Sequence, residues 1–373
     1  MRILFINLPY AGHVIPTIGL VQELTRAGHE VTYLMASDWE ARIRESGAEF
    51  LGYANSPKLD KQIRNAFLKA ENVIADFDLV LYEQFFFLGK HLAEKHGKKC
   101  ARIFTAPATN RELMKAFLSS GGPMGIFRFP LIGILWTMDA VKDLGIRMQY
   151  RNWLEEITEN PPECNLVYTL RQFQPFGKAF PEGRFHFIGP SVYERREEEM
   201  LLPEGTVIYI SLGTILKGAV GFFQTSLEAF RGEPVTVVLS VGRDFSAGRL
   251  KNIPENIIVR NRVPQVSVLK QTSLFITHGG MNSVSEAMTE GVPMVVIPFV
   301  SDQPVNARQV ERLGLGKVLP YKGLTPERLR EAAYAVLADE IIAGNVREMQ
   351  AQIAEAPGNA GAVKILEAFF EDK

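Results

Sequence analysis

The sequence is poor in cysteine. Its 373 residues include only two, Cys100 and Cys164, and neither lies in a CxxC pair or at a zinc-ligand spacing. This scarcity argues against a disulfide framework and favours a reducing compartment. The N-terminal segment MRILFINLPYAGH also lacks the long apolar core and the small-residue cleavage site of a signal peptide. We therefore expect a cytoplasmic protein.

Neither sign of charge is in excess, because 41 Lys and Arg residues face 42 Asp and Glu residues, a formal net charge of −1. This balance gives no electrostatic reason to expect a nucleic-acid partner. A long apolar run is also absent: the longest, near Phe127 to Met138, is interrupted by Arg128 and Pro130. Spanning a bilayer needs roughly 20 apolar residues, so we expect no stable membrane insertion. A buried loop or helix is the favoured interpretation of this run, over contact with a membrane surface.

The chain length predicts about two domains, and hydrophobic residues at 46% are ordinary for a globular protein. Apolar runs alternate with helical patterns from the start, which indicates a doubly wound α/β domain. The expected elements are strands near 2–8, 30–35, 78–82, 100–105, 166–169 and 185–188, and helices near 15–27, 38–46, 59–75 and 86–96. Pro16 is expected in the first turn of its helix, and Glu83 just past the strand 78–82.

The composition changes in the segment GPSVYERREEEMLLPEG, residues 189–205, where a charge cluster is flanked by Pro and Gly. An interdomain linker explains it, although a charged surface loop is the alternative. The strand pattern restarts directly afterwards, with TVIYISL at 206–212. We expect an N-terminal domain over 1–190, a linker over 191–205 and a C-terminal domain over 206–357. Further strands are expected near 235–241 and 257–261, and helices near 221–230, 266–270, 325–338 and 360–370.

The most informative stretch is LFITHGGMNSVSEAMTEGVPMVVIPFVSDQ, residues 274–303, which predicts strand, Gly-rich turn, helix, strand and loop. Gly279 and Gly280 let the backbone approach a ligand, and the helix that follows presents unpaired N–H groups to an anion. His278, Asn282 and Ser283 add donors, and Glu286 is suited to ribose hydroxyls. The loop residues Asp302 and Gln303 are candidates for sugar hydroxyls. A plain strand-to-helix connection is the alternative interpretation of the turn alone.

His13 is the candidate for acid–base chemistry. It follows the first predicted strand, at the sheet edge where open α/β sheets bind ligands. A helix N-terminus disfavours imidazolium, so His13 should stay neutral and able to accept a proton. Glu83 ends a strand of the same sheet, and a carboxylate on the second imidazole nitrogen would fix the tautomer. Taken singly, a histidine after glycine is as often structural. The neighbouring run Phe85-Phe86-Phe87 indicates an acceptor pocket or core packing, and core packing is at least as favoured for two of the three.

These residues resemble the UDP-glycosyltransferase family, the inverting enzymes of the glycosyltransferase B fold, and most closely its bacterial macrolide and flavonoid branch. The branch pattern is FITHGGMNSVxEA, then GVPMVxxPxxxDQxxNAxxV, and the likeness continues here through Asn306, Ala307 and Val310. It spans essentially the whole chain and is dense here and near the N-terminus. The resemblance implies two Rossmann-like domains facing across a cleft, an acceptor-binding one and a nucleotide-sugar-binding one, with the C-terminal helix, 358–373, returning to the first.

The resemblance also implies roles for single residues. Gly12-His13-Val14-Ile15-Pro16 resembles the catalytic-base loop GHxxP, and Glu83 stands where the family usually has the aspartate partner of the base. Ser211-Leu212-Gly213-Thr214 resembles the SFGT loop, with Thr214 toward the β-phosphate. Arg262 replaces the base-stacking tryptophan of the W-x-PQ region. The donor-binding positions implied are Thr214, Arg262, Val263, Gln265, His278, Gly280, Met281, Asn282, Ser283, Glu286, Asp302 and Gln303.

The implied function is inverting transfer of a hexose, glucose by the Asp302-Gln303 ending, from a UDP-sugar to a hydroxyl. The region 111–153, rich in Phe, Met and Trp, indicates a small apolar or aromatic acceptor, as in natural-product glycosylation. UDP-sugar is a co-substrate, and we expect no cofactor or metal because the chain has no DxD-type motif. Two rivals stay open: a non-catalytic nucleotide-sugar-binding auxiliary protein, and a transferase acting on a lipid-linked acceptor. A monomer and a homodimer are equally compatible with the sequence.

Overall fold

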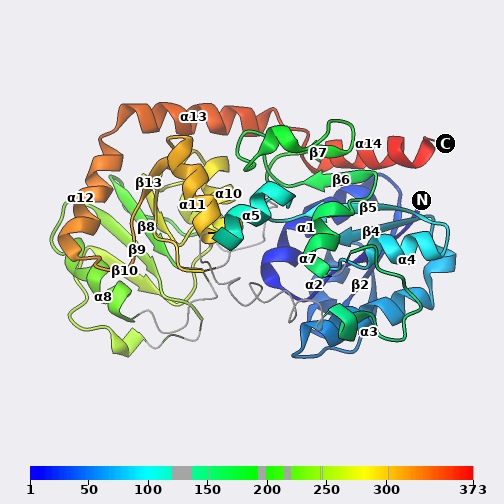
Figure 1. Ribbon diagram of the computed structural model, residues 1–373. Coiled ribbons are helices and arrows are strands. Elements are labelled where there is room, and N and C mark those ends of the chain that lie inside the picture. Colours follow the sequence, from blue (N-terminus) through cyan, green and yellow to red (C-terminus); the bar gives the residue numbers. More distant parts are fainter. Residues whose placement is uncertain are drawn as a thin grey trace. The chain divides into compact units, whose positions relative to one another are not determined.

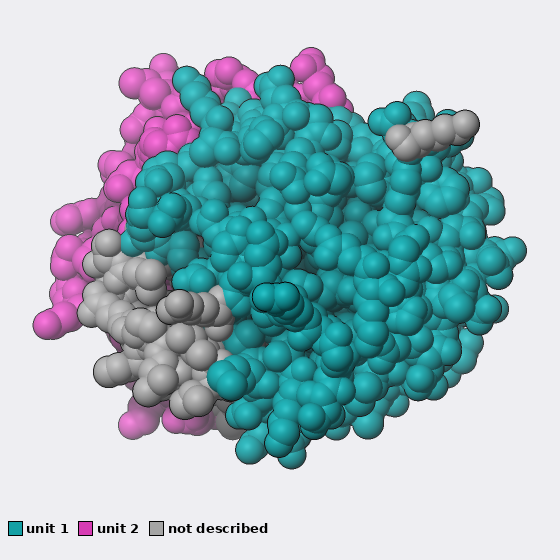
Figure 2. Space-filling view, turned by 45° about the vertical axis from the view of Figure 1, so that its right-hand side comes forward, with its two compact units in different colours: residues 1–193, 356–373 teal, residues 194–355 magenta. Residues whose placement is uncertain are grey.

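The computed structural model describes residues 1–119, 137–150, 152–191, 199–213, 220–243, 245, 247–300 and 302–372. The chain divides into two compact units, Met1–Tyr193 with Ala356–Lys373, and Glu194–Glu355 (Figure 2). Three predicted features lie wholly or partly outside the described residues: Thr214, the middle of the linker at 192–198, and residues 120–136 of the aromatic-rich region. Among the described helices, none is long and apolar enough to cross a membrane.

The first unit is built on a seven-stranded sheet in the order β3-β2-β1-β4-β5-β6-β7, and every pair of neighbours is parallel. Its central strands are buried on both faces, which explains their continuous apolar runs. In register, Ile3 of β1 lies between Val31 of β2 and Leu79 of β4. The strands are β1 Arg2–Ile6, β2 Glu30–Ala36, β3 Glu49–Tyr53, β4 Leu79–Glu83, β5 Lys99–Phe104, β6 Cys164–Val167 and β7 Phe185–Phe187.

Helices cover both faces of this sheet (Figure 1). One apolar core joins α1 and the C-terminal helix α14 to the sheet, with Ile18, Val363 and Leu366 in it; the other lies under α3, α4 and α7. The chain thus returns to the first unit at its end. The helices are α1 Ala11–Arg26, α2 Glu40–Glu45, α3 Leu59–Glu71, α4 Gly89–Lys95, α5 Arg111–Ser119, α7 Trp153–Glu159 and α14 Gly358–Glu371, with short 3₁₀ turns η1 Ser37–Trp39, η2 Ile74–Asp76 and η4 Gly177–Ala179.

The second unit repeats this plan with a six-stranded parallel sheet in the order β10-β9-β8-β11-β12-β13. Its strands are β8 Val207–Ser211, β9 Thr236–Ser240, β10 Ile257–Arg260, β11 Leu274–Thr277, β12 Met294–Val296 and β13 Gly316–Val318. Its helices are α8 Val220–Ala229, α9 Gln265–Leu269, α10 Met281–Thr289, α11 Gln303–Arg312, α12 Pro326–Leu337 and α13 Glu340–Ala354, with η5 Ala247–Arg249.

In each sheet, the direction in which the chain adds new strands reverses once. In the first unit the strands run outward from β1 through β2 to β3, and the chain then crosses to β4 on the other side of β1. In the second unit the same change falls between β8 and β11. Ligands of open α/β sheets bind at the carboxyl ends of the strands at such a switch point. His13 and Glu83 adjoin the first switch point, and His278 adjoins the second.

The structure corrects several predicted boundaries. Helix α1 begins at Ala11, so His13 lies in its first turn instead of in a preceding loop, and Pro16 lies in the second turn. A proline there removes one intrahelical N–H, which the packed helix tolerates. Glu83 is the last residue of β4 rather than the residue after it. The helix expected from 86 starts at Gly89, because Phe86 and Phe87 enter the core first.

Candidate active site

In the first unit, the His13 side chain lies against the buried carboxylate of Glu83. Nδ1 of His13 is 2.9 Å from Oε1 of Glu83, and the two side chains are 19% and 0% exposed. Strand β4 delivers Glu83 and the first turn of α1 delivers His13, on the two sides of the switch point. The carboxylate is held from its other side by the Phe85 backbone N–H, which donates to Oε2 at 2.9 Å.

Thr105 completes this contact and was not among the predicted residues. Its Oγ1 lies 2.7 Å from Nδ1 of His13 and donates to Oε1 of Glu83 at 2.8 Å. An ionised carboxylate only accepts hydrogen bonds, so the proton of neutral His13 resides on Nδ1. The Nε2 lone pair is then the basic one. The carboxylate also stabilises imidazolium if Nε2 takes up a proton, which is the arrangement of a general base.

The first turn of α1 is itself anchored by a buried amide. Nδ2 of Asn7, just beyond β1, donates to the His13 carbonyl at 3.0 Å and to the Tyr33 hydroxyl at 2.9 Å. Oδ1 of Asn7 accepts from the Leu8 N–H at 2.7 Å. Asn7 is fully buried. These bonds fix the backbone that carries His13, so the imidazole is held from both its side-chain and its main-chain ends.

Aromatic rings border His13. The Phe85 ring meets the imidazole edge-on, with ring centroids 4.5 Å apart, and Tyr10 approaches at 6.3 Å. Behind Phe85 lies Trp153 of α7, at 6.4 Å. Phe86 and Phe87 are core residues, at 0% and 4% exposure. The aromatic run therefore divides as the sequence favoured: two rings pack in the core, and one adjoins the candidate base.

In the second unit, the His278 ring fills the space between two glycines. A Cβ on Gly213 would come within 2.7 Å of Cε1 of His278, and one on Gly280 within 2.5 Å of Nε2. Gly279 has φ +83°, a conformation that L side chains rarely adopt. Burial lowers the pKa of His278 to about 4, against the opposing influence of Asp302 and a hydrogen bond with the Ser211 backbone. His278 is therefore neutral near pH 7.

Three of the predicted donor-binding residues form one hydrogen-bonded group. Nε2 of Gln265 donates to Oε2 of Glu286 at 2.5 Å and reaches Oγ of Ser283 at 3.4 Å. The Tyr209 hydroxyl donates to Oε1 of Gln265 at 3.0 Å and so fixes the orientation of the amide. Gln265 opens α9, whereas Ser283 and Glu286 share one face of α10. The group presents a carboxylate, a hydroxyl and an amide at one end of the sheet.

The loop before α11 contacts the turn before α10. Oδ2 of Asp302 accepts from the Met281 backbone N–H at 3.3 Å and from Nδ2 of Asn306 at 2.8 Å. The same amide nitrogen donates to the Gly279 carbonyl at 2.9 Å. Gln303 is almost fully buried, and its Oε1 accepts from the N–H groups of Phe299 and Val300. Because Oε1 already accepts two hydrogen bonds, Nε2 is the side-chain atom of Gln303 that is left to donate to a sugar hydroxyl.

The other predicted donor residues have plainer surroundings. Val263 and Met281 are buried, Asn282 is half-buried, and Arg262 is exposed between β10 and α9. Thr214 lies outside the described residues.

Two residues that hold the site together, Thr105 and Asn306, were given no role by sequence reasoning. A signal existed for each. Thr105 is the polar residue directly after β5, the strand next to β4, and Asn306 follows Asp302 by one helical turn in α11. Polar residues at the ends of neighbouring parallel strands meet at one edge of a sheet, so Thr105 could have been added to the list on that ground.

The chain is similar in sequence to known proteins. Residues 234–369 match the C-terminal domain family of erythromycin biosynthesis protein CIII-like proteins. The chain is 33% identical to NDP-glycosyltransferase YjiC of Bacillus licheniformis, over 99% of this chain and 98% of the relative. It is 29% identical to demethyllactenocin mycarosyltransferase of Streptomyces fradiae, over 99% and 86%.

Two solved glycosyltransferase structures are similar to this fold. CalG4, the calicheamicin glycosyltransferase, superposes with a TM-score of 0.84 at 29% identity, over 100% of this chain and 98% of that one. The glycotransferase of kitacinnamycin gives 0.86 at 28% identity, over 98% of both chains. Fold and relatives together define a nucleotide-sugar-dependent glycosyltransferase of the B fold. The chain belongs to the bacterial macrolide and natural-product glycosyltransferase family.

Proposed function

We propose that this glycosyltransferase moves a hexose, glucose, from a UDP-sugar to a hydroxyl of a small apolar or aromatic acceptor, with inversion at the anomeric carbon. The observation that carries the proposal is the His13–Glu83–Thr105 contact, which leaves Nε2 of His13 as the basic atom. The Phe85 and Tyr10 rings beside the imidazole suit an aromatic acceptor.

In this mechanism the acceptor hydroxyl gives its proton to Nε2 of His13. The acceptor oxygen bonds to the anomeric carbon from the face opposite the leaving group, and the bond from that carbon to the β-phosphate oxygen breaks with its electron pair. Glu83 stabilises the imidazolium formed, while Thr105 keeps the carboxylate in place. His13 then returns its proton to solvent, so the enzyme is unchanged at the end of the cycle.

For the donor, we assign the diphosphate to the start of α10. Backbone N–H groups and the helix dipole meet its charge there, aided by neutral His278, Asn282, Ser283 and Thr214. These groups supply the leaving-group stabilisation without a metal in our proposal. Glu286 and Gln265 would receive the ribose and base, with Arg262 stacking on the base. Asp302 and Gln303 would orient the hexose.

The choice of UDP-glucose goes beyond the coarser nucleotide-sugar assignment. The names of relatives differ: one is called an NDP-glycosyltransferase, and another, YojK of Bacillus subtilis, an uncharacterized UDP-glucosyltransferase. The Asp302-Gln303 ending of the loop supports glucose here. We also propose a cytoplasmic location, which the two free cysteines support.

The test is incubation of the purified protein with UDP-glucose and a panel of phenols and flavonoids, followed by mass spectrometry of the products. Parallel reactions use TDP-glucose and UDP-galactose. We expect a glycoside heavier than its acceptor by one hexosyl group, made fastest from UDP-glucose. UDP binding without any product would favour the auxiliary-protein alternative. Product formed only from a detergent-dispersed polyprenyl acceptor would favour the lipid-linked alternative.

A further inference from the structure

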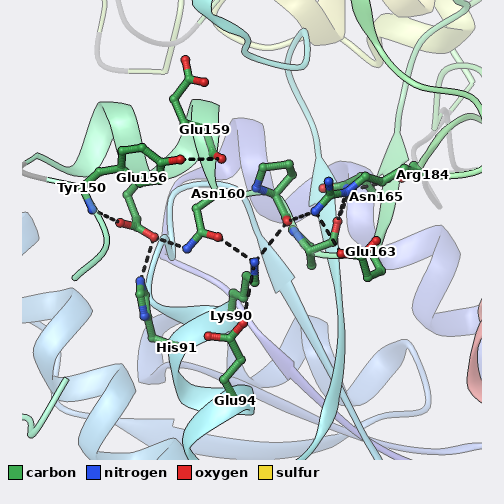
Figure 3. Close-up of polar contacts among 12 residues, drawn as sticks. Lys90, His91, Glu94, Tyr150, Glu156, Glu159, Asn160, Glu163, Asn165 and Arg184 are labelled. Carbon is green, nitrogen blue, oxygen red and sulfur yellow. Dashed lines mark hydrogen bonds and ion pairs between the residues drawn. The ribbon is translucent and has the colours of Figure 1, made fainter. Parts of the chain in front are cut away.

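A buried histidine–carboxylate contact fastens α7 to α4 on one side of the first sheet. Nε2 of His91 in α4 lies 2.7 Å from Oε1 of Glu156 in α7, and the two side chains are 8% and 1% exposed (Figure 3). The proposed chemistry uses neither residue. Burying a carboxylate is costly unless it is well hydrogen-bonded, so the presence of this contact indicates a role.

The Glu156 carboxylate accepts hydrogen bonds from three parts of the chain. Besides His91 it accepts from Nδ2 of Asn160, and from the Tyr150 backbone N–H at 3.3 Å (Figure 3). Nζ of Lys90 in turn donates to Oδ1 of Asn160 at 2.6 Å. Although burial raises the pKa of Glu156, the hydrogen bonds from His91 and Asn160 hold it below its usual value. The carboxylate is therefore ionised, and His91 must donate from Nε2.

Helix α7, which Glu156 holds in this way, is connected to the candidate base His13 by a series of ring contacts. Trp153 lies three residues before Glu156 in α7, on the same side of the helix, and is 6% exposed. Its ring adjoins Phe85 at 6.4 Å, and Phe85 meets His13 at 4.5 Å. Helix α7 has only seven residues, too few to persist by helix propensity alone. Its position therefore depends on tertiary contacts, among them the bonds that Glu156 makes and the packing of Trp153.

We infer that His91 and Glu156 are positioning residues, which hold α7 so that Trp153 supports the Phe85 ring as one wall of the acceptor site. This inference deepens the proposed function and rests on it. The class of ligand that the wall suits is an aromatic ring carrying the reactive hydroxyl. The pair acts through Trp153 and Phe85 and touches neither substrate.

The kinetic test compares three variants. His91→Leu keeps the bulk of the side chain but removes the donor, whereas His91→Gln keeps an N–H donor near the position of Nε2. His29→Leu is the control, because His29 makes a more exposed contact with Glu367 of α14, at 3.0 Å, away from α4 and α7. We expect His91→Leu to raise the acceptor KM about tenfold and to leave the donor KM within about twofold. His91→Gln should restore most of the acceptor affinity, and His29→Leu should leave it unchanged.

A second measurement does not need turnover. The chain has three tryptophans, Trp39, Trp136 and Trp153, so a Trp39→Phe, Trp136→Phe background leaves Trp153 as the sole reporter. In that background His91→Leu should shift Trp153 emission to the red and increase its quenching by acrylamide, and His29→Leu should not. If His91→Leu does not fold, Glu156→Gln replaces it, because it keeps the size and one acceptor oxygen.

The inference is overturned if His91→Leu leaves both the acceptor KM and the Trp153 emission unchanged. It is also overturned if donor and acceptor KM rise together, which would indicate general destabilisation. A wild-type protein without transferase activity would refute the proposed function. The Trp153 measurement would still show whether the pair positions α7, so the two failures are distinguishable.

Discussion

His13 and Glu83 flank the switch point of the first sheet, and His278 adjoins that of the second, where it follows the strand that corresponds to β4. The two histidines have opposite surroundings. His13 is 19% exposed and rests on a carboxylate, whereas His278 is 6% exposed, lies between two glycines and has a pKa of about 4. One imidazole can gain a proton and share the charge with Glu83. The other is kept neutral and can serve only as a hydrogen-bonding group.

The difference follows from what lies opposite each ring. In the first unit β4 ends in a carboxylate, and β5 is followed by a hydroxyl that holds it. In the second unit the chain after β8 offers Gly213, whose missing side chain makes room for the His278 ring. In our proposal the same topology therefore yields a proton acceptor in one unit and an anion-binding turn in the other. Four experiments test this difference between the two histidines.

The largest effect is expected from His13→Ala. Removal of the general base should lower kcat by about 10²–10⁴-fold, because the acceptor hydroxyl loses its proton acceptor. UDP affinity, measured by calorimetry, should stay within about twofold, since the donor residues belong to the other unit. His278→Ala is the contrasting variant and should weaken UDP binding instead. Retained turnover in His13→Ala would remove this residue from the mechanism.

Next comes the pH dependence of stability that His278 confers. The pKa of His278 is about 4 in the folded protein, against an ordinary value of 6.5 that applies to the unfolded chain. Between these pH values the unfolded chain therefore binds more protons than the folded protein. The contribution of His278 to the free energy of unfolding is complete above about pH 6.5, and roughly 3 kcal/mol of it is lost as the pH falls to about 4. Urea unfolding at pH 7 and at pH 4.5 measures this loss, and His278→Leu should reduce it. Equal pH dependence in the two proteins would contradict the neutral, buried imidazole.

The sequence predicted the architecture well where its patterns were long. The strands beside both switch points and the glycine that ends α1 were found from apolar runs and turn residues. The three-residue strand β13 was missed, and so was β3, which is partly polar, because neither shows a clear period. Helix α13 was missed as well, although its bounds, Glu340–Ala354, follow an Asp339 N-cap.

The contacts of the site were predicted less completely. That His13 and Glu83 meet follows from the rule that parallel strands end at one edge of the sheet. The hydrogen bond of Thr105 to both of them depends on a side-chain rotamer, which no sequence period encodes. The approach of Asp302 to the start of α10 joins two loops, and loop geometry is likewise absent from the pattern.

Glu83→Gln sharpens the account of His13 without removing the base. The amide keeps the size of the side chain, but it has a single acceptor oxygen for the donors at His13, Thr105 and Phe85. We expect kcat to fall about 10–100-fold, with UDP affinity unchanged. Glu83→Asp, the residue usual in the family, should also lose activity, because the shorter side chain cannot keep all three contacts. Full activity of Glu83→Gln would mean that the negative charge is not needed.

The smallest effect is expected at Asn306, which joins the two loops of the second unit. Its Nδ2 donates to the Gly279 carbonyl and to Asp302, so it fixes the glycine turn and the carboxylate relative to each other. Asn306→Leu removes both bonds from a fully buried position and should raise the donor KM about 5–10-fold with little change in acceptor KM. Asn306→Asp should be worse, because two carboxylates would then face each other in a buried place. A rise in acceptor KM instead would mean that this contact does not act through the donor turn. The assignment of donor binding to the unit of His278 and of acceptor activation to the unit of His13 would then be wrong.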